Sequence, residues 1–492
     1  MYDRKQTFKN AVFSVTQIVI SAGSLFLVYR YLLQTFGPEL LGVWSIVMAV
    51  SSLAKIGDLG FSGGMTRFIA KYKALNQDFA ILEIIETGTI SLICFIVIIA
   101  LVSYPIANYF FPNLFSSQKL YQARQLLPYS IASFGLLAIA GVPLSGLDGF
   151  QRGDKRNMIL MAGTILYTIL IFLFVKKDDI VSVGQVQLCQ SFFVLLLSWL
   201  AIRKEAKMTI FLPSHWSYSR FREMFSYNLN LQFIVLSSFL LEPLTKVLLG
   251  KFGSLSMVGY FEMSSKLVAQ FRSVIVNVNQ VLVPVIANLN EKYKSEISIL
   301  YLKTYNILFL VAISFYAGLV VIVPVASKFW LGEINRFFIF NAYLIVVAMF
   351  INTMTGPAYF SNMGTGKLIA NLNSHLIMGA LNLILGFLLG EMFGGFGVVL
   401  AYSIGILSGS VYLIFRFMKA ESISTNTLIP NNSRNLAAMY LLIAVLMIVI
   451  SSYLDTHLFS AYVVISCISI FIMAVIGFKS PLFRELISLR RA

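Results

Sequence analysis

Apolar runs of about 20 residues recur along the whole chain, and the short segments between them combine charged residues with Gly, Pro, Asn or Ser. A helix rises 1.5 Å per residue, so about 20 apolar residues cross the hydrocarbon core of a bilayer. The pattern therefore predicts an all-α polytopic membrane protein with about fourteen transmembrane helices. Their predicted ranges are 10–33, 42–66, 84–110, 125–147, 157–175, 181–202, 226–250, 257–290, 300–326, 337–360, 368–391, 395–418, 435–454 and 459–478.

Composition supports this prediction. Residues of the set AVILMFWYC make up 58% of the chain and charged residues only 12%, whereas soluble domains average about 45–50% apolar and about 25% charged residues. An ordinary soluble enzyme is therefore excluded. The first apolar run is too long for a signal peptide and no small-residue cleavage site follows it, so we expect it to be retained.

The three cysteines, Cys94, Cys189 and Cys467, all lie inside apolar runs. They show neither a CxxC motif nor a Cys/His spacing typical of metal ligands, so the sequence supports neither a disulfide framework nor a metal site. We expect them to be small core residues, and we expect no cofactor.

The distribution of Lys and Arg among the loops predicts the orientation, because basic loops resist translocation. If the N-terminus is cytoplasmic, 25 Lys and Arg residues fall on the cytoplasmic side, including Lys303 and Arg416 at the cytoplasmic ends of predicted helices; 7 fall on the opposite side, and the remaining five lie further within the predicted helices or toward their outer ends. We therefore expect both termini to be cytoplasmic. The net charge of +16 then reflects membrane topology, and we expect no nucleic-acid partner.

No loop is long enough for a separate catalytic or nucleotide-binding domain. The longest is the basic segment from Arg203 to Arg222, and the sequence has no GxxxxGK[ST], HExxH or GxSxG motif. We therefore expect a protein that is not an enzyme and that works through its helices. Its energy source would be an ion gradient or the gradient of its own substrate.

An internal repeat relates the two halves of the chain. The segments 30–37 and 246–253 share the pattern LLxxFG at an offset of 216, and one inserted residue then aligns Gly42 with Gly259 at an offset of 217. The halves begin six helices apart, an even number, so the repeats are parallel. The predicted domains are an N-terminal six-helix lobe, a C-terminal six-helix lobe, and two additional helices with a cytoplasmic tail, at 1–205, 206–420 and 421–492.

The five cations within the predicted helices are candidate ligands for a substrate. They are Arg30, Lys55, Lys246, Lys266 and Arg272. A cation at the centre of a lone helix costs about 2.5–3.5 kcal/mol, so such residues usually face a bundle interior or a hydrated cavity. The repeat aligns Lys55 with Arg272, and both lie too deep to reach the interface easily. Arg30 and Lys246 lie near helix ends, where snorkelling is the alternative explanation.

Three acids within the helices are candidates for ion coupling. Asp58 follows Lys55 by three residues, Glu242 precedes Lys246 by four, and Glu262 precedes Lys266 by four. Each acid is placed to neutralise its neighbour on one helical face. Each is equally a carboxylate that could exchange a proton or Na⁺ as a cavity opens to either side, and the residues alone leave both interpretations open.

A cavity lined by several cations and few acids, in a chain with 14% aromatic residues, suits an anionic substrate that carries phosphate or carboxylate together with sugar rings. Arg offers two parallel hydrogen bonds to a phosphate, and Lys offers a mobile point charge. The same lining would repel a cationic drug.

Three segments resemble a known family. They are FGPELLGVWSIV at 36–47, KIGDLGFSGGMTRFIAKY at 55–72 and LDGFQRGDKRN at 147–157. The first two resemble the start of the polysaccharide transporters of the multidrug/oligosaccharidyl-lipid/polysaccharide (MOP) superfamily, and the third resembles the basic turn between the fourth and fifth helices of those transporters. Within that superfamily the resemblance is to lipid-linked oligosaccharide flippases of the O-antigen type.

The resemblance implies two six-helix lobes around a V-shaped, cationic central cavity in the bacterial inner membrane. Alternating access would carry an undecaprenyl-diphosphate-linked sugar from the cytoplasmic to the outer leaflet, for O-antigen, lipopolysaccharide or another surface polysaccharide. Phosphate-interacting positions would be Arg30, Lys55, Lys246 and Arg272, and Lys266 is a further candidate. The partners would be the lipid-linked oligosaccharide, membrane lipids, and the polymerase and chain-length machinery.

Three alternatives remain. The first is a multidrug or cation antiporter of the same superfamily, which the surplus of cations disfavours. The second is a peptidoglycan-precursor (lipid II) flippase, because the last two helices resemble the extra pair that forms a lipid-tail groove in those proteins; the DLG motif at 58–60 favours the O-antigen type instead. The third is a membrane-embedded glycan polymerase or ligase, which would need larger outer loops than this chain has.

Overall fold

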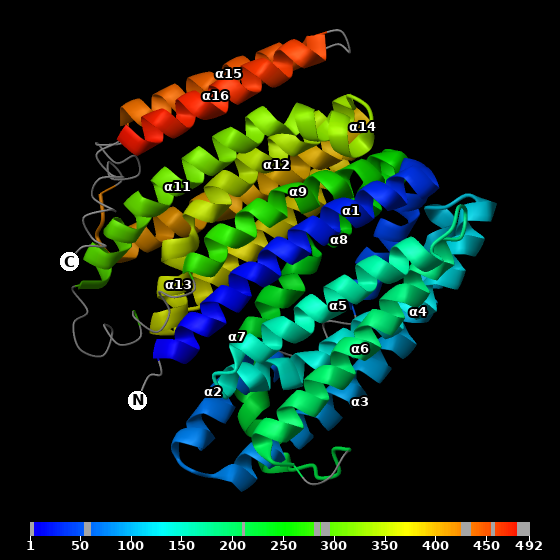
Figure 1. Ribbon diagram of the computed structural model, residues 1–492, viewed down its shortest axis with the longest axis vertical. Helices are drawn as coiled ribbons and strands as arrows, with labels where there is room; N and C mark the ends of the chain where they lie inside the picture. The colour runs from blue at the N-terminus through cyan, green and yellow to red at the C-terminus, as the bar shows by residue number, and fades with distance from the viewer. Residues whose placement is uncertain are drawn as a thin grey trace. The chain divides into compact units, whose positions relative to one another are not determined.

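The computed structural model describes residues 4–53, 61–208, 212–279, 286, 296–424, 434–453 and 458–479. These residues form helices, and no strand occurs among them (Figure 1). The helices are α1 (Arg4–Ser51), α2 (Phe61–Ala74), α3 (Asp78–Phe110), α4 (Ser117–Gly149), α5 (Gly153–Phe174), α6 (Ile180–Ala206), α7 (Tyr218–Phe239), α8 (Glu242–Phe252), α9 (Leu255–Asn279), α11 (Glu296–Ala326), α12 (Arg336–Met354), α13 (Gly356–Thr365), α14 (Ile369–Ala420), α15 (Arg434–Ser452) and α16 (Phe459–Lys479), with one-turn helices at Phe111–Asn113 and Ser327–Leu331.

The predicted all-α membrane fold is confirmed. Eleven helical stretches in the described part of the chain are long and apolar enough to cross a membrane. Two of them, in α1 and α14, have 44 and 52 residues, about twice the length that a bilayer requires, and each covers two predicted helices or parts of them. The predicted range 42–66 includes the end of α1, the start of α2 and residues outside the described ranges.

Glycines mark the bends in these two long helices. Gly37 has φ 73° and ψ 174° within α1, and Gly394 has φ 62° and ψ −143° within α14. Residues with a Cβ rarely adopt a positive φ, whereas glycine does so without steric cost. Each glycine therefore allows a sharp bend between two apolar runs without an extended loop. Both glycines lie where the sequence pattern predicted a short connection between two helices.

The chain divides into two compact units, Met1–Gly259 and Tyr260–Ala492. The first unit contains α1 to α8 and the first residues of α9. The lobes predicted from the repeat, with a boundary at 205/206, are a different division of the chain, and they stay a prediction.

In the first unit, α4 packs along α6 and α1 along α5. Small residues allow the close approach: a Cβ on Gly184 would lie 2.6 Å from Leu126, and the hydroxyls of Ser133 and Ser191 lie 2.7 Å apart across α4 and α6. Lipid tails are as apolar as leucine, so helices in a membrane associate through such packing and through polar contacts rather than through the hydrophobic effect.

Loops predicted to share a side of the membrane lie together in the first unit. At one end Lys119 pairs with Glu39, and the Tyr31 hydroxyl donates to the Val175 carbonyl at 2.9 Å. At the other end Lys73 donates to the Phe150 carbonyl. The predicted arrangement, in which successive helices cross the membrane in opposite directions, therefore agrees with the structure of this unit.

Asp154 fastens the start of α1 to the start of α5. Its side chain is only 1% exposed, and it accepts Lys9 at 2.8 Å, Arg152 at 3.2 Å and Gln6 at 2.9 Å. Asn10 completes the contact by accepting the Asp154 backbone N–H at 2.9 Å. A buried carboxylate with this many donors is stabilised in its charged form and holds the two helix starts together.

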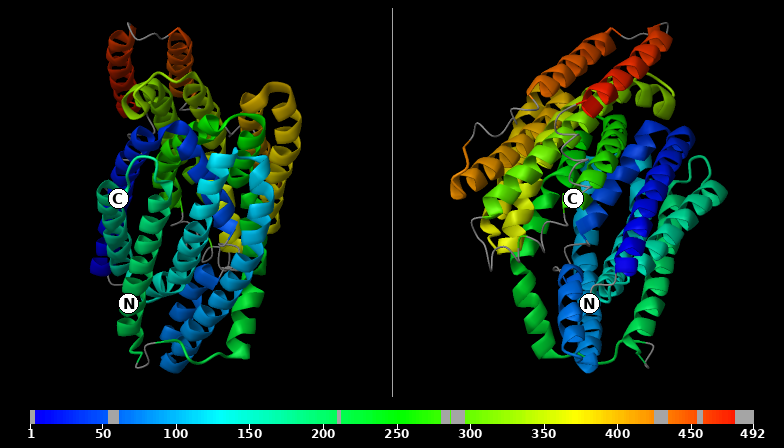
Figure 2. Two further views of the ribbon diagram at one scale, coloured as in Figure 1. Left: turned by 90° about the vertical axis from the view of Figure 1, so that its right-hand side faces the viewer. Right: turned by 60° about the vertical axis from the view of Figure 1, so that its left-hand side comes forward.

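In the second unit, α15 and α16 pack side by side against α11 (Figure 2). The Tyr440 hydroxyl donates to the Met473 carbonyl at 2.6 Å, and the Tyr462 hydroxyl donates to the Val321 carbonyl at 3.2 Å. These bonds link α15 to α16 and α16 to α11. The two additional C-terminal helices are therefore integral to this unit.

The expectation that the cysteines are core residues is wrong. Cys94, Cys189 and Cys467 are free and exposed on the surface of the protein. Since an apolar side chain in a membrane protein can face either lipid or the protein interior, location within an apolar run does not distinguish the two.

The second part of α1 crosses the start of α9 at two glycines. A Cβ on Gly42 would lie 1.9 Å from the Leu255 carbonyl oxygen, and a Cβ on Gly259 would lie 2.4 Å from the Pro38 carbonyl oxygen. The repeat offset of 217 aligns Gly42 with Gly259 and Pro38 with Leu255. The contact of Gly42 with Leu255 and the contact of Gly259 with Pro38 are therefore equivalent under the repeat. This reciprocity is what a two-fold relation between equivalent segments produces, and it supports the repeat register derived from the sequence.

We predict that Gly42→Ala destabilises the protein, because the new Cβ would overlap backbone, which cannot move aside as a flexible side chain can. Overpacking typically costs about 1–3 kcal/mol, so the thermal unfolding midpoint in detergent should fall by several degrees. Gly23→Ala on the same helix is the control, since no atom lies within 4 Å of its Cβ position. Equal midpoints for the two variants would contradict the close crossing.

Candidate functional site

The cations predicted within the membrane have different surroundings in the structure. Arg30 lies exposed on α1, and no carboxylate pairs with it among the described residues. Lys55 and Asp58 lie outside the described residues. The roles predicted for all of these residues stay predictions.

Lys246 is neutralised on its own helix. Its ammonium lies 2.8 Å from the Glu242 carboxylate, one turn earlier on α8, and the exposed fractions of the two side chains are 7% and 35%. An i,i+4 pair of this kind places opposite charges on one helical face. The structure therefore contains the neutralising pair that the spacing allowed.

Lys266 is paired in the same way in the second unit. Its ammonium lies 3.5 Å from the carboxylate of Glu262, whose side chain is 5% exposed. Burying a lone carboxylate is costly unless it is paired or protonated. Both Lys–Glu pairs are thus local neutral pairs, and an exchange of ions at either carboxylate would require its lysine to move away.

Arg272 differs because its partner in the structure is uncharged. Its Nη2 donates to Asn352 Oδ1 at 2.8 Å, and Asn352 in turn donates to Ser410 at 3.0 Å. Its Nε is buried without a hydrogen-bond partner. In the described part of the chain, Arg272 is thus a half-buried guanidinium with an unused donor and no neutralising acid, which suits it to bind an anion.

The polar residues around Arg272 come from α11, α12, α13 and α14. The Tyr316 hydroxyl and the Thr353 hydroxyl lie 2.7 Å apart, and the ring of Tyr359 meets the ring of His375 edge-on. The sequence identified Arg272 but not Asn352, which lies 80 residues further along the chain. No group of three or more His, Cys, Asp or Glu in the described ranges could hold a metal ion.

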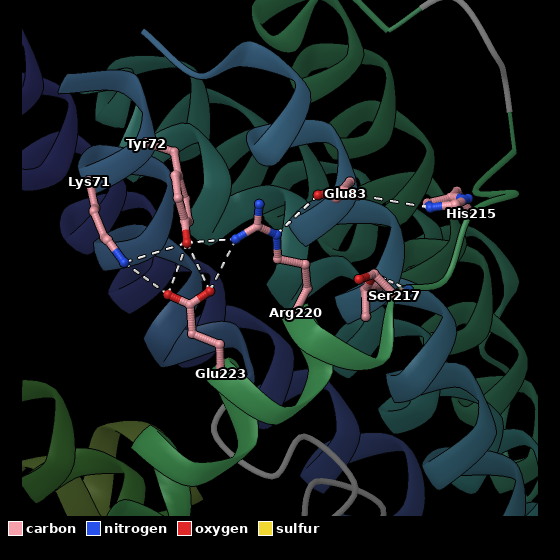
Figure 3. A network of polar contacts seen from close by, with 8 residues as sticks. Lys71, Tyr72, Glu83, His215, Ser217, Arg220 and Glu223 are labelled. Carbon is pink, nitrogen blue, oxygen red and sulfur yellow. Dashed lines mark hydrogen bonds and ion pairs between the residues drawn. The ribbon is translucent and has the colours of Figure 1, made fainter. Parts of the chain in front are cut away.

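A second cluster of charged residues, which the sequence did not single out, joins α2, α3 and α7 (Figure 3). Glu223 on α7 accepts Lys71 at 2.9 Å and the Tyr72 hydroxyl at 2.8 Å, both on α2. Arg220 donates to the Tyr72 hydroxyl at 2.8 Å and to Glu83 on α3 at 3.0 Å. We call these five residues the α7 network; they lie on the predicted cytoplasmic side.

The segment before α7 is also docked on α3. The buried Glu86 carboxylate accepts the backbone N–H groups of Ser214 and His215 at 3.0 and 2.7 Å. The Ser217 N–H donates to the Thr87 hydroxyl at 3.1 Å, and the Trp216 indole donates to Ser91 at 2.9 Å. The described part of the longest predicted loop is therefore held against the protein by specific hydrogen bonds.

Electrostatics favours the charged form of this network. Desolvation by itself would raise the pKa of Glu223, but the hydrogen bonds from Lys71, Tyr72 and Arg220 outweigh it and lower that pKa below its usual 4.5. The hydrogen bond to Glu223 raises the pKa of Lys71 above its usual 10.5. The contribution of Glu223 to stability is therefore present at neutral pH and is lost as the pH falls through its lowered pKa.

The α7 network fastens the start of a membrane-crossing segment to the first unit. The candidate span begins at Phe233, beyond these contacts. Arg220 and Glu223 on α7 contact three side chains of α2 and α3. The network therefore anchors the first turns of α7 before this helix enters the membrane. Sequence reasoning could have suggested the partners only from their charges, since their spacing carries no periodic signal.

We predict that Glu223→Gln loosens the start of α7. Loss of the charged acceptor should cost about 1 kcal/mol, which corresponds to about fivefold faster exchange of the backbone amides in residues 212–225. Hydrogen–deuterium exchange with mass spectrometry measures this. Glu391→Gln, at an exposed glutamate without a partner among the described residues, is the control. Unchanged exchange in Glu223→Gln would show that the network does not hold α7.

Solved membrane transporters share this fold. One described as the inward-facing conformation of a multidrug resistance MATE family transporter of the MOP superfamily has a TM-score of 0.70 and 14% identity, and covers 82% of this chain and 94% of its own. The lipid II flippase MurJ, in an inward closed conformation, has a TM-score of 0.69 and 15% identity, and covers 97% of this chain and 99% of its own. A MOP superfamily transporter from Pyrococcus furiosus, whose description states a reverse polarity of its binding pocket, has a TM-score of 0.59 and 14% identity, and covers 82% and 95%.

No curated protein sequence matches the chain significantly. The family model described as polysaccharide biosynthesis protein matches residues 7–290. This match includes the segments at 36–47, 55–72 and 147–157 that carry the resemblance in the sequence, and the fold is that of the MOP superfamily transporters. Because the match extends over more than half of its length, the chain belongs to the polysaccharide biosynthesis protein family.

Proposed function

We propose that this protein is a flippase for an undecaprenyl-diphosphate-linked oligosaccharide. Its cargo would be the repeat unit of O-antigen, and hence of lipopolysaccharide, or of another surface polysaccharide. It would move that cargo from the cytoplasmic to the outer leaflet of the bacterial inner membrane by alternating access coupled to an ion. Membership of the polysaccharide biosynthesis protein family supports a glycan cargo.

The observation that carries this proposal is that two arginines within the predicted membrane segments have no neutralising carboxylate among the described residues, whereas two lysines do. Lys246 and Lys266 are neutralised by glutamates on their own helices. Arg30 and Arg272 have no carboxylate partner among the described residues, and one lies in each unit. Unneutralised cations in a membrane segment are costly and mark function, and guanidinium groups suit the two phosphates of a lipid diphosphate.

The sequence repeat aligns Arg30 with Lys246 and Lys55 with Arg272, so each guanidinium group has a lysine as its counterpart in the other half of the chain. In the proposed mechanism the lobes 1–205 and 206–420 open a central cavity alternately to each side, with 421–492 as an addition. Lys55 would join Arg30 and Arg272 in binding the diphosphate. Lys246 and Lys266 would do so when released from Glu242 and Glu262, and those carboxylates, or Asp58, would then take up the coupling ion.

The orientation follows from the 25 to 7 distribution of Lys and Arg, which places both termini in the cytoplasm. The cargo would then enter from the side where nucleotide-activated sugars are assembled on the lipid. On the outer side it would be handed to the polymerase and chain-length machinery. The protein itself would catalyse no covalent step.

A lipid II flippase is the second candidate function. The solved lipid II flippase covers 97% of this chain, whereas the MATE transporter covers 82%, so the former also shares the region of the last two helices. Its named cargo is likewise a lipid-linked glycan. Both candidates would use an anion site at Arg30 and Arg272, and they differ in the head group that the lipid diphosphate carries.

We predict that Arg30→Ala combined with Arg272→Ala reduces flipping of a fluorescent undecaprenyl-diphosphate oligosaccharide in proteoliposomes by at least about tenfold. Each lost charge-assisted hydrogen bond should cost about 1.5–3 kcal/mol of binding energy. Arg272→Lys should recover part of the activity, since it keeps the charge but not the bidentate geometry. Lys419→Ala, outside the predicted helices, is the control. Equal transport by all variants would remove the anion site.

We also predict that the protein does not export cationic fluorescent dyes, because unneutralised guanidinium groups repel a cation that enters the same cavity. Dye efflux from inverted vesicles measures this. The variant that combines Arg30→Ala with Arg272→Ala tests this reason in proteoliposomes. Dye flux should rise in the variant, which lacks the repelling guanidinium groups, and should stay low in the wild type. Efficient dye export by the wild type, together with absent lipid flipping, would favour the multidrug antiporter instead.

A further inference from the structure

A hollow of about 580 Å³ opens where α4 and α6 begin, at one end of the first unit. Its polar lining comes from Gln118, Tyr121, Gln122 and Gln125 on α4 and from Asp178 and Asp179 before α6. The volume falls within the range of about 300–1,000 Å³ typical of small-molecule sites. Neither the family match nor the sequence-derived candidate residues account for this hollow.

The glutamines are arranged to present their amides together. Positions 118, 122 and 125 are spaced i, i+4 and i+7, which places them on one face of a helix. Tyr121 lies between them with 65% of its surface exposed. No hydrogen bond within the described part of the protein uses the side chains of Gln118, Gln122, Gln125 or Tyr121. Their donors and acceptors are therefore free for a ligand.

The lining has the hydrogen-bonding character that a sugar requires. Each hydroxyl of a sugar both donates and accepts, and each glutamine amide does the same, while Asp178 and Asp179 accept only. No Lys or Arg is among the lining residues, so a phosphate would have no cation to bind. No group of three or more His, Cys, Asp or Glu suited to a metal occurs in the described ranges. The ring of Tyr121 offers an apolar face for the C–H side of a sugar.

The position of the hollow relates it to transport. Residues 117–125 and 178–181 lie at the end of the unit where Lys119 meets Glu39 and Tyr31 meets Val175. The distribution of Lys and Arg predicts this end to be the outer one. We propose that the hollow is a binding site for the oligosaccharide part of the cargo on the outer side of the membrane. This inference rests on the proposed flippase function and adds a site away from the diphosphate.

The test is binding of the glycan without its lipid and phosphates. Mild acid releases the free reducing oligosaccharide from undecaprenyl-diphosphate-linked intermediates, and saturation-transfer difference NMR detects its contact with the protein in lipid nanodiscs. Gln122→Ala combined with Gln125→Ala should weaken the signal about fivefold or more, since each lost hydrogen bond is worth about 1 kcal/mol. Gln77→Ala, at an exposed glutamine without a side-chain cap at the opposite end, should leave it unchanged.

Three results would overturn the proposal: no signal with the wild type, an equal signal with the Gln122→Ala and Gln125→Ala variant, or displacement of the glycan by inorganic phosphate. The lipid-flipping assay separates this site from the function. Flipping without glycan binding would remove the site and leave the flippase in place. Glycan binding without flipping of the lipid-linked form would leave the site and remove the flippase.

Discussion

The hydrocarbon core of the membrane is the constraint on which the rest of this structure depends. An unpaired backbone N–H or C=O costs several kcal/mol there, so a chain of this composition satisfies its backbone within helices. Because lipid competes equally for apolar side chains, the helices are then held together by close approach and by polar contacts. Gly42 and Gly259 supply the first where α1 crosses α9, and Asp154 supplies the second where α1 meets α5.

The same constraint requires that each charge within a membrane helix be neutralised or hydrogen-bonded. Glu242 and Glu262 neutralise their lysines one turn away, so these pairs require no ligand to be stable in the membrane. Arg272 has instead an amide partner in Asn352 and a buried Nε without one. When the two neutral pairs are set aside, the charge left within the helices is that of guanidinium groups, whose geometry suits phosphate, and the proposed anion transport depends on this remaining charge.

At the predicted cytoplasmic end, polar contacts also decide which helices are joined to α7. Glu223 and Arg220 hold the start of α7 to α2 and α3, and Glu86 holds the segment before it. The first turns of α7 are thus part of the first compact unit, although the sequence repeat assigns this helix to the second half of the chain.

The sequence by itself determined the helical class, the approximate helix positions and the resemblance to the MOP superfamily, because each depends on residues close together in the chain. It offered the two Lys–Glu pairs as one of two interpretations, and the structure contains both pairs. The repeat register also came from the sequence, and the reciprocal contacts of Gly42 and Gly259 agree with it. Only the tertiary structure brought Asn352 to Arg272, 80 residues away, and Glu223 to Lys71, 152 residues away. It alone revealed the glutamine-lined hollow between α4 and α6. Long-range polar contacts leave no periodic signal in a sequence, since any of many equivalent side chains could have been the partner.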